Sequence, residues 1–481
     1  MTQTRVTKRQ NLFINGEWKE AEEYTPLYSP YNGEILAEIP KASIQEADEA
    51  IDAAVAAQTA MKKLAAHERS EILSNLVQLL EENAEKAAEI IAKEAAKPLT
   101  TARGEVARTI QTYKFAAQEA NHIYGETLPL DAAPGGEKRL AYTKHEPLGV
   151  IGAITPFNFP MNLVAHKVGP AIATGNTIVL KPASQTPLSS YFLAELLEKA
   201  GLPAGALNVI TGSGRVVGDR IVTDDRVSMI TFTGSPEVGK EIRSKAGLKR
   251  TTLELGSNAA VIVDEDVDLD RIIGRCVQGA FGFQGQVCIS LQRVYVHEKL
   301  YDAFVEKFVA KTKELVTGDP LDEKTDVSAL ISEGDVDRVL AWVKEAEENG
   351  AEVKTGGKRD GNVVLPTVLT NVPADAKVSC QEVFGPTVMI NSVKSVDDAI
   401  AEVNNSRYGL QAGIYTNNIH KAMNASDELE VGGVMINDIP TFRVDHMPYG
   451  GVKESGTGRE GIKYAVEEMT ELKLVVVNHN I

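Results

Sequence analysis

The sequence has little cysteine and no long hydrophobic run, and each shortage excludes a class of protein. Of its 481 residues only three are cysteines, Cys276, Cys288 and Cys380, and they stand far apart without a C-x-x-C pair. A disulfide scaffold and a zinc-ribbon site are therefore excluded, and no metal site is expected. The longest uncharged run, residues 147–165, contains three prolines and two asparagines, so it does not predict a membrane helix.

Basic residues are also outnumbered, because 50 Lys and Arg face 67 Asp and Glu, for a net charge of −17. Such a chain repels phosphate backbones and anionic lipid, so we expect neither a nucleic-acid nor a membrane partner. The opening stretch, MTQTRVTKRQNLF, has no apolar core of the kind that a signal peptide needs, and a reducing cytoplasm is the expected compartment. The content of 43% hydrophobic residues is typical of a globular protein of two or three domains.

Two series of alternating strands and helices organise the chain after a first third that reads as helical. Ser43 and Glu46 form an S-x-x-E capping box ahead of the alanine-rich residues 47–61. From about residue 140, short apolar runs alternate with helical stretches, which indicates βαβ units and mostly parallel, doubly wound sheets. The runs predicted as strands are Gly149–Thr155, Thr177–Lys181, Leu207–Thr211, Met229–Thr233, Ala260–Val263, Val294–His297, Thr387–Ile390 and Gly413–Tyr415.

Three residues in separate motifs have the chemistry of a covalent catalyst. Cys288 follows two glycines, which allow a sharp turn and place it at the start of a new element. A thiol near a helix N-terminus has a lowered pKa and is more nucleophilic, and the alternative is a buried structural cysteine. Glu254 ends an apolar strand, where burial raises a carboxyl pKa and suits a general base, unless it is merely salt-bridged. Asn158, in the stiff turn Thr155–Pro160, offers an amide to an oxyanion or else caps its own backbone.

Three loops that contain glycine or serine follow consecutive predicted strands. They are Lys181–Ser184, Gly212–Gly214 and Phe232–Ser235, and the last opens a helix at Pro236. Such a loop before a helix suits a phosphate, through backbone N–H groups and the helix dipole. None is the GxGxxG fingerprint and each alone could be an ordinary turn, yet three in succession favour a dinucleotide. Glu382 could accept ribose hydroxyls or be a solvated turn glutamate.

Taken together, the stretches TPFNFP, KPAS, FTGSPEVG, LELGS, GQVC, EVFGP and MPYGGVKESGTGRE resemble the aldehyde dehydrogenase superfamily over essentially the whole chain. The resemblance implies that Cys288 is the nucleophile, Glu254 the general base and Asn158 the oxyanion donor, with NAD or NADP as cofactor. Cofactor contacts are then expected at Thr155, Pro156, Phe157, Lys181, Ser184, Gly214, Gly218, Phe232, Thr233, Gly234, Ser235, Leu255, Gly256, Glu382 and Phe384.

The fold class expected is α/β, with two doubly wound domains and a small β arm. The C-terminal run Leu472–Val477 lacks a local partner, and in the family such an arm joins the sheet of a neighbouring subunit, so a homodimer or homotetramer is expected. The expected ranges are 1–122 and 146–255 for an NAD(P)-binding domain, 256–445 for a catalytic domain, and 123–145 and 465–481 for the arm.

One departure from the family concerns the cofactor. Many NAD-preferring relatives carry a glutamate three residues after the equivalent of Lys181, and this chain has Ser184 there. Without that carboxylate, a 2′-phosphate meets no like charge and can pair with Lys181. We therefore expect NADP to be accepted, alongside NAD.

The substrate is predicted only as a small aldehyde, hydroxylated or anionic. The stretch around Arg443 resembles the branch that acts on lactaldehyde, glyceraldehyde 3-phosphate and phosphonoacetaldehyde, and Arg443 or Arg108 could clamp an anionic tail. The alternative for both is a surface or interdomain salt bridge. Val287 stands where relatives that bind phosphorylated aldehydes often carry arginine, which favours a small hydroxyaldehyde.

Two further functions stay open at this stage. A CoA-acylating semialdehyde dehydrogenase would pass the acyl group to CoA, but such relatives generally lack the equivalent of Glu254. A non-catalytic descendant of the fold would have no need to retain Cys288, Glu254 and Asn158 together.

Overall fold

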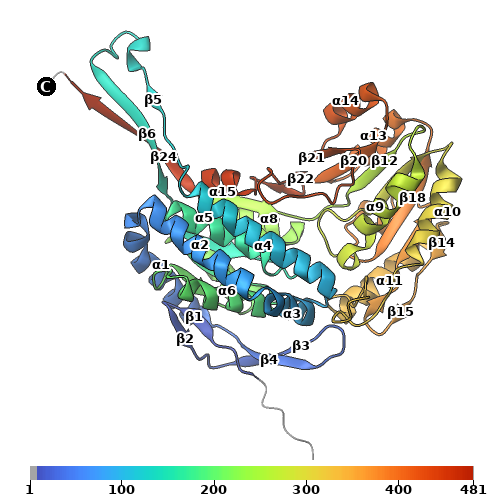
Figure 1. Ribbon diagram of the computed structural model, residues 1–481, viewed down its shortest axis with the longest axis horizontal. Helices are drawn as coiled ribbons and strands as arrows, with labels where there is room; N and C mark the ends of the chain where they lie inside the picture. Colours follow the sequence, from blue (N-terminus) through green and yellow to red (C-terminus); the bar gives the residue numbers. More distant parts are fainter. Residues whose placement is uncertain (1–7, 480–481) are drawn as a thin grey trace, which may run out of the picture.

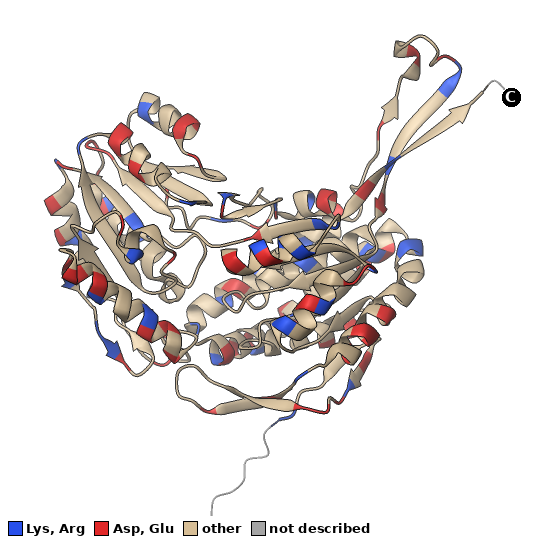
Figure 2. Ribbon diagram, turned by 180° about the vertical axis from the view of Figure 1, so that it is seen from behind, with Lys and Arg blue, Asp and Glu red and all other residues tan. Residues whose placement is uncertain are grey.

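Two helix-covered sheets and a projecting arm make up the molecule, seen in the computed structural model of Figure 1. The structure describes residues 8–479, so the first part of the stretch examined for a signal peptide lies outside the described residues. Among the described residues, no helix is long and apolar enough to cross a membrane. Figure 2 shows Lys and Arg interspersed with Asp and Glu over the helices of both layers.

The first sheet has eight strands, and its centre is parallel from β9 to β11. Its outer strands β1, β2 and β23 are antiparallel. The predicted strands at 149–155, 177–181, 207–211 and 229–233 are all confirmed in it. In order across the sheet, the strands are β2 (Glu17–Lys19), β1 (Leu12–Ile14), β9 (Leu207–Val209), β8 (Thr177–Lys181), β7 (Val150–Ile154), β10 (Val227–Thr233), β11 (Arg250–Glu254) and β23 (Gly456–Thr457).

Helices cover both faces of this sheet because successive side chains of each strand point to opposite sides. On β7, Ile151 and Ala153 pack into one core, whereas Val150 packs into the other. The first core is covered by α2 (Ala66–Glu82), α3 (Ala84–Ala95), α4 (Leu99–Glu119), α5 (Asn162–Thr174), α6 (Leu188–Lys199) and α15 (Ile462–Glu468). The second is covered by α1 (Ile44–Lys63), α7 (Asp219–Thr223) and α8 (Pro236–Lys245).

The second sheet has seven strands and is parallel except for its edge strand β14. It confirms the other four predicted strands. Its order is β14 (Glu352–Thr355), β17 (Thr367–Thr370), β18 (Thr387–Val393), β13 (Arg293–His297), β12 (Ala260–Val263), β20 (Gln411–Tyr415) and β21 (Gly433–Ile436). Its helices are α9 (Leu269–Phe281), α10 (Tyr301–Thr312), α11 (Glu333–Glu348), α12 (Lys377–Cys380), α13 (Val396–Asn404) and α14 (Ile419–Glu428).

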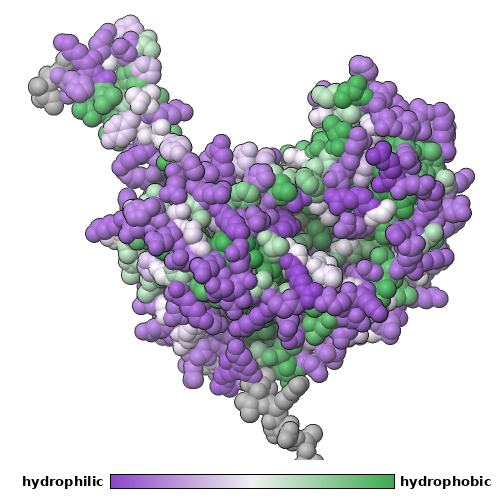
Figure 3. Space-filling model, viewed as in Figure 1, coloured by the Kyte–Doolittle hydropathy of each residue, from purple (hydrophilic) through white to green (hydrophobic). Residues whose placement is uncertain are grey.

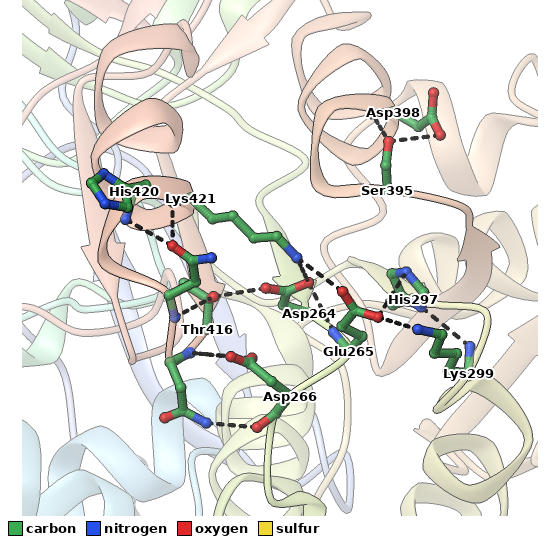
Figure 4. Close-up of polar contacts among 12 residues, drawn as sticks. Asp264, Glu265, Asp266, His297, Lys299, Ser395, Asp398, Thr416, His420 and Lys421 are labelled. Atoms are coloured by element: carbon green, nitrogen blue, oxygen red, sulfur yellow. Dashed lines mark hydrogen bonds and ion pairs between the residues drawn. The ribbon is translucent and has the colours of Figure 1, made fainter.

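A buried carboxylate ties the end of β12 to β20 and α14 (Figure 4). Asp264 is fully buried, and it accepts hydrogen bonds from Thr416 Oγ1 at 2.7 Å and from Lys421 Nζ at 2.8 Å. Lys421 also reaches Glu265 at 3.4 Å. Because the buried charge of Asp264 is paired and hydrogen-bonded, this cluster fastens the carboxyl end of β12 to β20 and α14.

The arm is a three-stranded antiparallel sheet that stands away from the body in Figure 1. Strand β24 (Thr470–Asn478) pairs along its whole length with β6 (Arg139–Pro147), and β6 pairs with β5 (Thr127–Leu128). The arm was expected to begin at residue 465, but its ladder begins at Thr470. The preceding helix α15 packs on α4 and α5 and so belongs to the first layer.

The expectation that the first third is all helical is wrong for the residues before α1. This stretch supplies β1 and β2 and a separate hairpin of β3 (Tyr24–Tyr28) and β4 (Ile35–Pro40). β1 is an apolar run of only three residues, and β2, β3 and β4 contain polar or charged residues, so none of them shows a long apolar run. The capping residue Glu46 does accept the Ser43 N–H, at 2.6 Å, as predicted. Two further two-residue ladders join β15 (Arg359–Asp360) to β16 (Val363–Val364) and β19 (Tyr408–Gly409) to β22 (Val452–Lys453).

Candidate active site

Cys288 lines two cavities and lies where they meet. The first has a volume of about 1070 Å³ and is lined by the carboxyl ends of β7, β8, β10 and β11 and by the loops that follow them. The second has about 660 Å³ and is lined by α4, α9 and the segment 439–449. Molecules that enter from the two cavities therefore reach the same sulfur atom. In Figure 3 the surface between the two layers is hollowed.

The turn that leads to Cys288 has a left-handed backbone at three consecutive residues. The φ angles are 49° at Phe283, 55° at Gln284 and 69° at Gly285. A Cβ at Gly285 would lie 2.2 Å from the carbonyl oxygen of Gly385, so only glycine fits there. The two other residues are strained, at about 1–3 kcal/mol each, and their surroundings must hold them.

Gln284 supplies the contacts that hold this turn. Its Nε2 donates to the carbonyl of Ala96 at 2.9 Å and to the carbonyl of Ala329 at 2.9 Å. Ala96 follows α3 of the first layer, and Ala329 precedes α11 of the second. Gln284 therefore ties the cysteine turn to both layers at once.

The lowered pKa predicted for Cys288 is contradicted by its surroundings. Cys288 lies in an irregular turn before β13, not at the start of a helix, and burial raises the pKa of its thiol to about 11. The Tyr449 hydroxyl, 2.8 Å from Sγ, and the charge of Arg443 act in the opposite direction. The carboxylates of Glu382 and Glu254 add to the increase.

Glu254 is buried at the carboxyl end of β11, as predicted, without a partner for its charge. It is 3% exposed, and neither carboxylate oxygen has a hydrogen-bond partner among the described residues. Burial raises the pKa of Glu254 well above its usual value, and the nearby charge of Glu460 adds to this. The alternative of a salt-bridged glutamate is therefore wrong, and Glu254 has the raised pKa that suits a general base.

Asn158 reaches across to the cysteine loop instead of capping its own backbone. It follows β7 and is 3% exposed. Its Nδ2 donates to the carbonyl of Gln286 at 3.0 Å, two residues before Cys288. The amide of Asn158 is thus fixed beside the loop that contains Gln286 and Cys288, where an N–H group can donate to an oxyanion.

The first cavity collects the residues expected to bind the cofactor. Ser184 alone among them does not line it, and this residue is exposed between Ala183 and Gln185, which do. The expected residues that line the cavity are Thr155, Pro156, Phe157, Lys181, Gly214, Gly218, Phe232, Thr233, Gly234, Ser235, Leu255, Gly256, Glu382 and Phe384.

Several features of this cavity fit a dinucleotide. Ser235 caps α8 by accepting the Val238 N–H at 3.4 Å, which leaves the helix N-terminus facing the cavity. Burial lowers the pKa of Lys181 to about 8. An anion bound beside Lys181 would stabilise its charged form. Arg215, exposed on the Gly214–Gly218 turn, also lines the cavity and was missed. Arg215 lies between Gly212 and Gly218, whose spacing with Gly214 is G-x-G-x-x-x-G, and this glycine-rich spacing could have pointed to it.

Glu382 is a half-buried acceptor, not a solvated turn glutamate. Its Oε1 accepts the Ser257 N–H at 2.9 Å, and burial raises the pKa of its carboxyl to about 7. A Cβ at Gly256 would lie 2.4 Å from Glu382 Oε2, so glycine is required for this approach. The geometry fixes a hydrogen-bond acceptor in the cavity wall, as a ribose would need.

The second cavity contains Arg108, Arg443 and Val287, and both arginines are also paired. Arg108 is 31% exposed and its Nη2 donates to Asp445 at 2.7 Å, which joins α4 to the segment before α15. Arg443 is 6% exposed and donates to Glu460 at 3.0 Å. Each of the two arginines therefore forms a salt bridge and also lines the cavity. Tyr449, which also lines this cavity, was not singled out from the sequence.

Comparison with known proteins shows the family. The family model described as "Aldehyde dehydrogenase family" matches residues 18–475. A 3-sulfolactaldehyde dehydrogenase of Priestia megaterium is 49% identical over 99% of this chain and 100% of that protein. A lactaldehyde dehydrogenase of Methanocaldococcus jannaschii is 44% identical over 97% of this chain and 100% of its own.

A solved structure shares the whole fold. The glyceraldehyde-3-phosphate dehydrogenase GapN of Methanocaldococcus jannaschii, complexed with NADP, superimposes with a TM-score of 0.92. It is 43% identical, over 95% of this chain and 100% of that one. The fold and the site therefore define an oxidoreductase that acts on aldehydes. The chain belongs to the aldehyde dehydrogenase family, and its cofactor is NAD or NADP.

Proposed function

We propose that this enzyme oxidises a small 2-hydroxyaldehyde to the carboxylic acid, through a thioester on Cys288. The observation that carries the proposal is the position of Cys288 at the junction of the two cavities, with Glu254 and Asn158 also lining the cofactor side. The names of the two relatives described above, both of which act on small hydroxyaldehydes, support the choice of substrate.

The first half of the reaction belongs to Cys288 and Asn158. The thiolate adds to the aldehyde carbon, and the Asn158 amide with the Cys288 backbone N–H stabilises the oxyanion of the hemithioacetal. One such donor is worth about 2.7–4 kcal/mol of barrier. Loss of a hydride from the hemithioacetal carbon leaves the thioester on Cys288. Ser235, Lys181 and Glu382 would hold NAD(P), which would supply the acceptor for that hydride.

The second half belongs to Glu254. The thioester on Cys288 is hydrolysed when Glu254 takes a proton from a water molecule and the acid leaves, which returns the thiolate. Glu254 acts as a base only when deprotonated. Because its pKa is raised, hydrolysis of the thioester should increase with pH up to a higher pH than an ordinary glutamate would allow.

For the cofactor we propose that NADP is accepted. Position 184, between the cavity-lining residues Ala183 and Gln185, carries no carboxylate to repel a 2′-phosphate, and Lys181 lines the cavity. Arg215 adds a second cation that was not considered from the sequence. The NADP in the GapN structure supports this choice.

For the far end of the substrate we propose Arg108. Its side chain is the more exposed of the two arginines and faces the second cavity, whereas Arg443 is almost fully buried. Val287 supplies apolar surface beside it in place of a further cation. Arg108 therefore suits a short tail, hydroxylated or anionic, on a three-carbon aldehyde.

A panel of aldehydes tests the proposed reaction. Purified enzyme is mixed with lactaldehyde, 3-sulfolactaldehyde, glyceraldehyde 3-phosphate or propionaldehyde, with NAD and NADP separately and without CoA, and the reduced cofactor is followed by absorbance. We expect the hydroxyaldehydes to have the higher kcat/KM. Propionaldehyde as the best substrate would contradict the proposal.

The same assay separates the CoA-acylating alternative. An unpaired, buried Glu254 serves hydrolysis, and a CoA-dependent enzyme would have no use for it. Turnover without CoA, with free acid as the product, supports hydrolysis. Turnover that requires CoA would favour the alternative.

We further propose that the arm joins subunits into a homodimer or homotetramer. Within residues 8–479, strand β24 pairs with β6 alone, and its side chains Leu472, Leu474 and Val476 are 56%, 55% and 46% exposed. Such an edge with apolar side chains is a template for another strand. Figure 3 shows apolar surface on the arm, and β21 of the second sheet offers a matching edge.

A further inference from the structure

The hydroxyl of Tyr449 contacts the reacting atom of the proposed nucleophile. Its oxygen lies 2.8 Å from Cys288 Sγ, and the residue is 3% exposed at the wall of the second cavity. The backbone of Tyr449 is fixed by two hydrogen bonds with Glu460, Tyr449 N–H to O at 3.0 Å and Glu460 N–H to O at 2.7 Å. The phenol therefore has a defined position beside the sulfur.

A cation is stacked on the ring of Tyr449. The guanidinium carbon of Arg443 lies 3.6 Å from the ring centroid, and Arg443 is held in turn by Glu460 at 3.0 Å. A cation over the ring face favours negative charge at the hydroxyl and so strengthens the hydroxyl as a hydrogen-bond donor. Glu460 therefore orders both the backbone of the tyrosine and its cation.

The direction of the hydrogen bond is fixed in the reactive form. A thiolate has no proton to donate, so the phenol must donate to it. Burial raises the pKa of Tyr449 well above its usual value, so its proton is retained at working pH. The phenol thus remains a donor for as long as the sulfur is ionised.

The other charged groups that face the sulfur do not provide this contact. Glu382 and Glu254 carry negative charge and oppose the thiolate. Arg443 favours it, but from behind the tyrosine ring. Since burial also opposes ionisation, the thiolate needs a direct donor on this side of the sulfur.

We propose that Tyr449 is a catalytic residue that donates the hydrogen bond holding the Cys288 thiolate, with Arg443 as the positioning cation behind its ring. This inference rests on the proposed role of Cys288 as the nucleophile. The phenol keeps its proton throughout, and the proton of the thiol leaves to solvent through the cavity. Tyr449 therefore sets the pH at which the nucleophile becomes reactive.

The test is the pH dependence of Cys288 alkylation in Tyr449→Phe, which keeps the ring and removes the hydroxyl. Iodoacetamide is added to the full-length enzyme from about pH 7 to about pH 11, and the rate at which the Cys288 peptide is alkylated is followed by mass spectrometry. Below the raised pKa of the thiol this rate is proportional to the thiolate fraction, so a displacement of the profile along the pH axis reports the displacement of its midpoint. A charge-assisted hydrogen bond should move the midpoint upward by about one to two pH units. Alkylation at neutral pH should then slow by about 10- to 100-fold.

The matched control is Tyr113→Phe, another buried tyrosine, whose hydroxyl has no hydrogen-bond partner among the described residues. It should leave the midpoint unchanged. A Tyr449→Phe midpoint equal to that of the wild type, whatever happens to kcat, would show that the tyrosine only fills space and would overturn the inference. Because alkylation is read without turnover, that result is distinct from failure of the proposed function, which would appear as full activity in Cys288→Ala.

Discussion

Cys288 is surrounded by groups that act on its ionisation in opposite directions. Burial raises the pKa of its thiol, and Glu254 and Glu382 add to this, while Tyr449 and Arg443 oppose it. In the proposed mechanism, Cys288 gains its reactivity from contacts with hydrogen-bond donors, not from a helix N-terminus. The side chains that surround the sulfur are therefore as important as the cysteine itself.

Replacing Cys288 by alanine should abolish dehydrogenation, because no other group can form the thioester. Cofactor binding, measured by titration of fluorescence, should remain intact. Cys276→Ala and Cys380→Ala are the controls and should stay active, since neither lines either cavity. More than trace turnover in Cys288→Ala would refute covalent catalysis by this residue.

Placing a carboxylate at Ser184 should reduce the use of NADP. Ser184→Glu restores a like charge beside the 2′-phosphate, and one charge-assisted contact is worth about 1.5–3 kcal/mol, so kcat/KM for NADP should fall about tenfold or more. The value for NAD should change little. Ser184→Gln is the matched control and should spare NADP. An unchanged ratio of NADP to NAD in Ser184→Glu would show that the adenosine end lies elsewhere.

The candidate site is predictable from the sequence wherever a motif ends a strand. Asn158 is found in this way because it follows the apolar run VIGAI of β7, and Glu254 because it is a carboxylate at the end of β11. The contacts and pKa shifts that could not be predicted from the sequence depend on segments that are distant in the chain. Tyr449 contacts Cys288 although the two residues are 161 positions apart in the chain. Burial, which has the largest effect on the pKa of the thiol, cannot be predicted from the residues next to Cys288 in the sequence.

Among the larger elements, the turn before Cys288 has a strained backbone, which the hydrogen bonds of Gln284 hold in place. Phe283 and Gln284 have left-handed backbones that ordinary residues avoid. Phe283 is also held by Lys97, whose ammonium lies 4.1 Å from its ring centroid. The turn therefore depends on contacts from the helical layer as well as on its own glycine.

Gln284→Ala should destabilise the protein and weaken catalysis together. Two buried carbonyl groups lose their donor, at about 1–3 kcal/mol each, and the turn is freed to relax. Thermal unfolding and kcat/KM report the two effects. Gln284→Glu, which cannot donate, should behave alike. The control is Gln78→Ala, since Gln78 is exposed and bonds only Glu82 on its own helix. A Gln284→Ala enzyme as stable as the control would rule out this tether.

Most parallel strands of the two sheets are predictable because they contain short apolar runs, such as VIGAI in β7 and AVIV in β12. The parallel strands β11, β17 and β21 were not among the predicted runs. Strand β8, at Thr177–Lys181, and strand β12, at Ala260–Val263, match their predicted bounds. The strands β1 to β4 could not be predicted in the same way. They are short and lie at the edge of the first sheet or outside it. β1 has only three residues, and β2, β3 and β4 contain polar or charged residues.

For the molecule as a whole, the arm is the feature that a single subunit does not explain. Its strand β24 exposes apolar side chains and leaves one edge without a partner in the described chain. A lone subunit with such an edge would be prone to aggregate. The exposed edge therefore supports the proposed assembly, in which a second chain would cover the arm.

Replacing both Leu474 and Val476 by glutamate should yield monomers. The two side chains lie on one face of β24, and charge there prevents burial against another chain. Analytical ultracentrifugation at micromolar concentration measures the outcome. The matched control is Lys473→Gln, on the opposite face, where Lys473 reaches only Glu146 at 2.8 Å. A wild-type monomer under the same conditions would contradict the proposed oligomer.

The fate of the acyl group in Glu254→Gln tests the central claim most directly. The variant keeps Cys288 and Asn158 but has no base to hydrolyse the thioester, so mixing it with lactaldehyde and NADP should give about one reduced cofactor per active site and then near silence. Mass spectrometry should find the acyl group on the peptide that contains Cys288. Normal steady-state turnover, or a burst with no adduct on Cys288, would contradict a thioester that Glu254 releases.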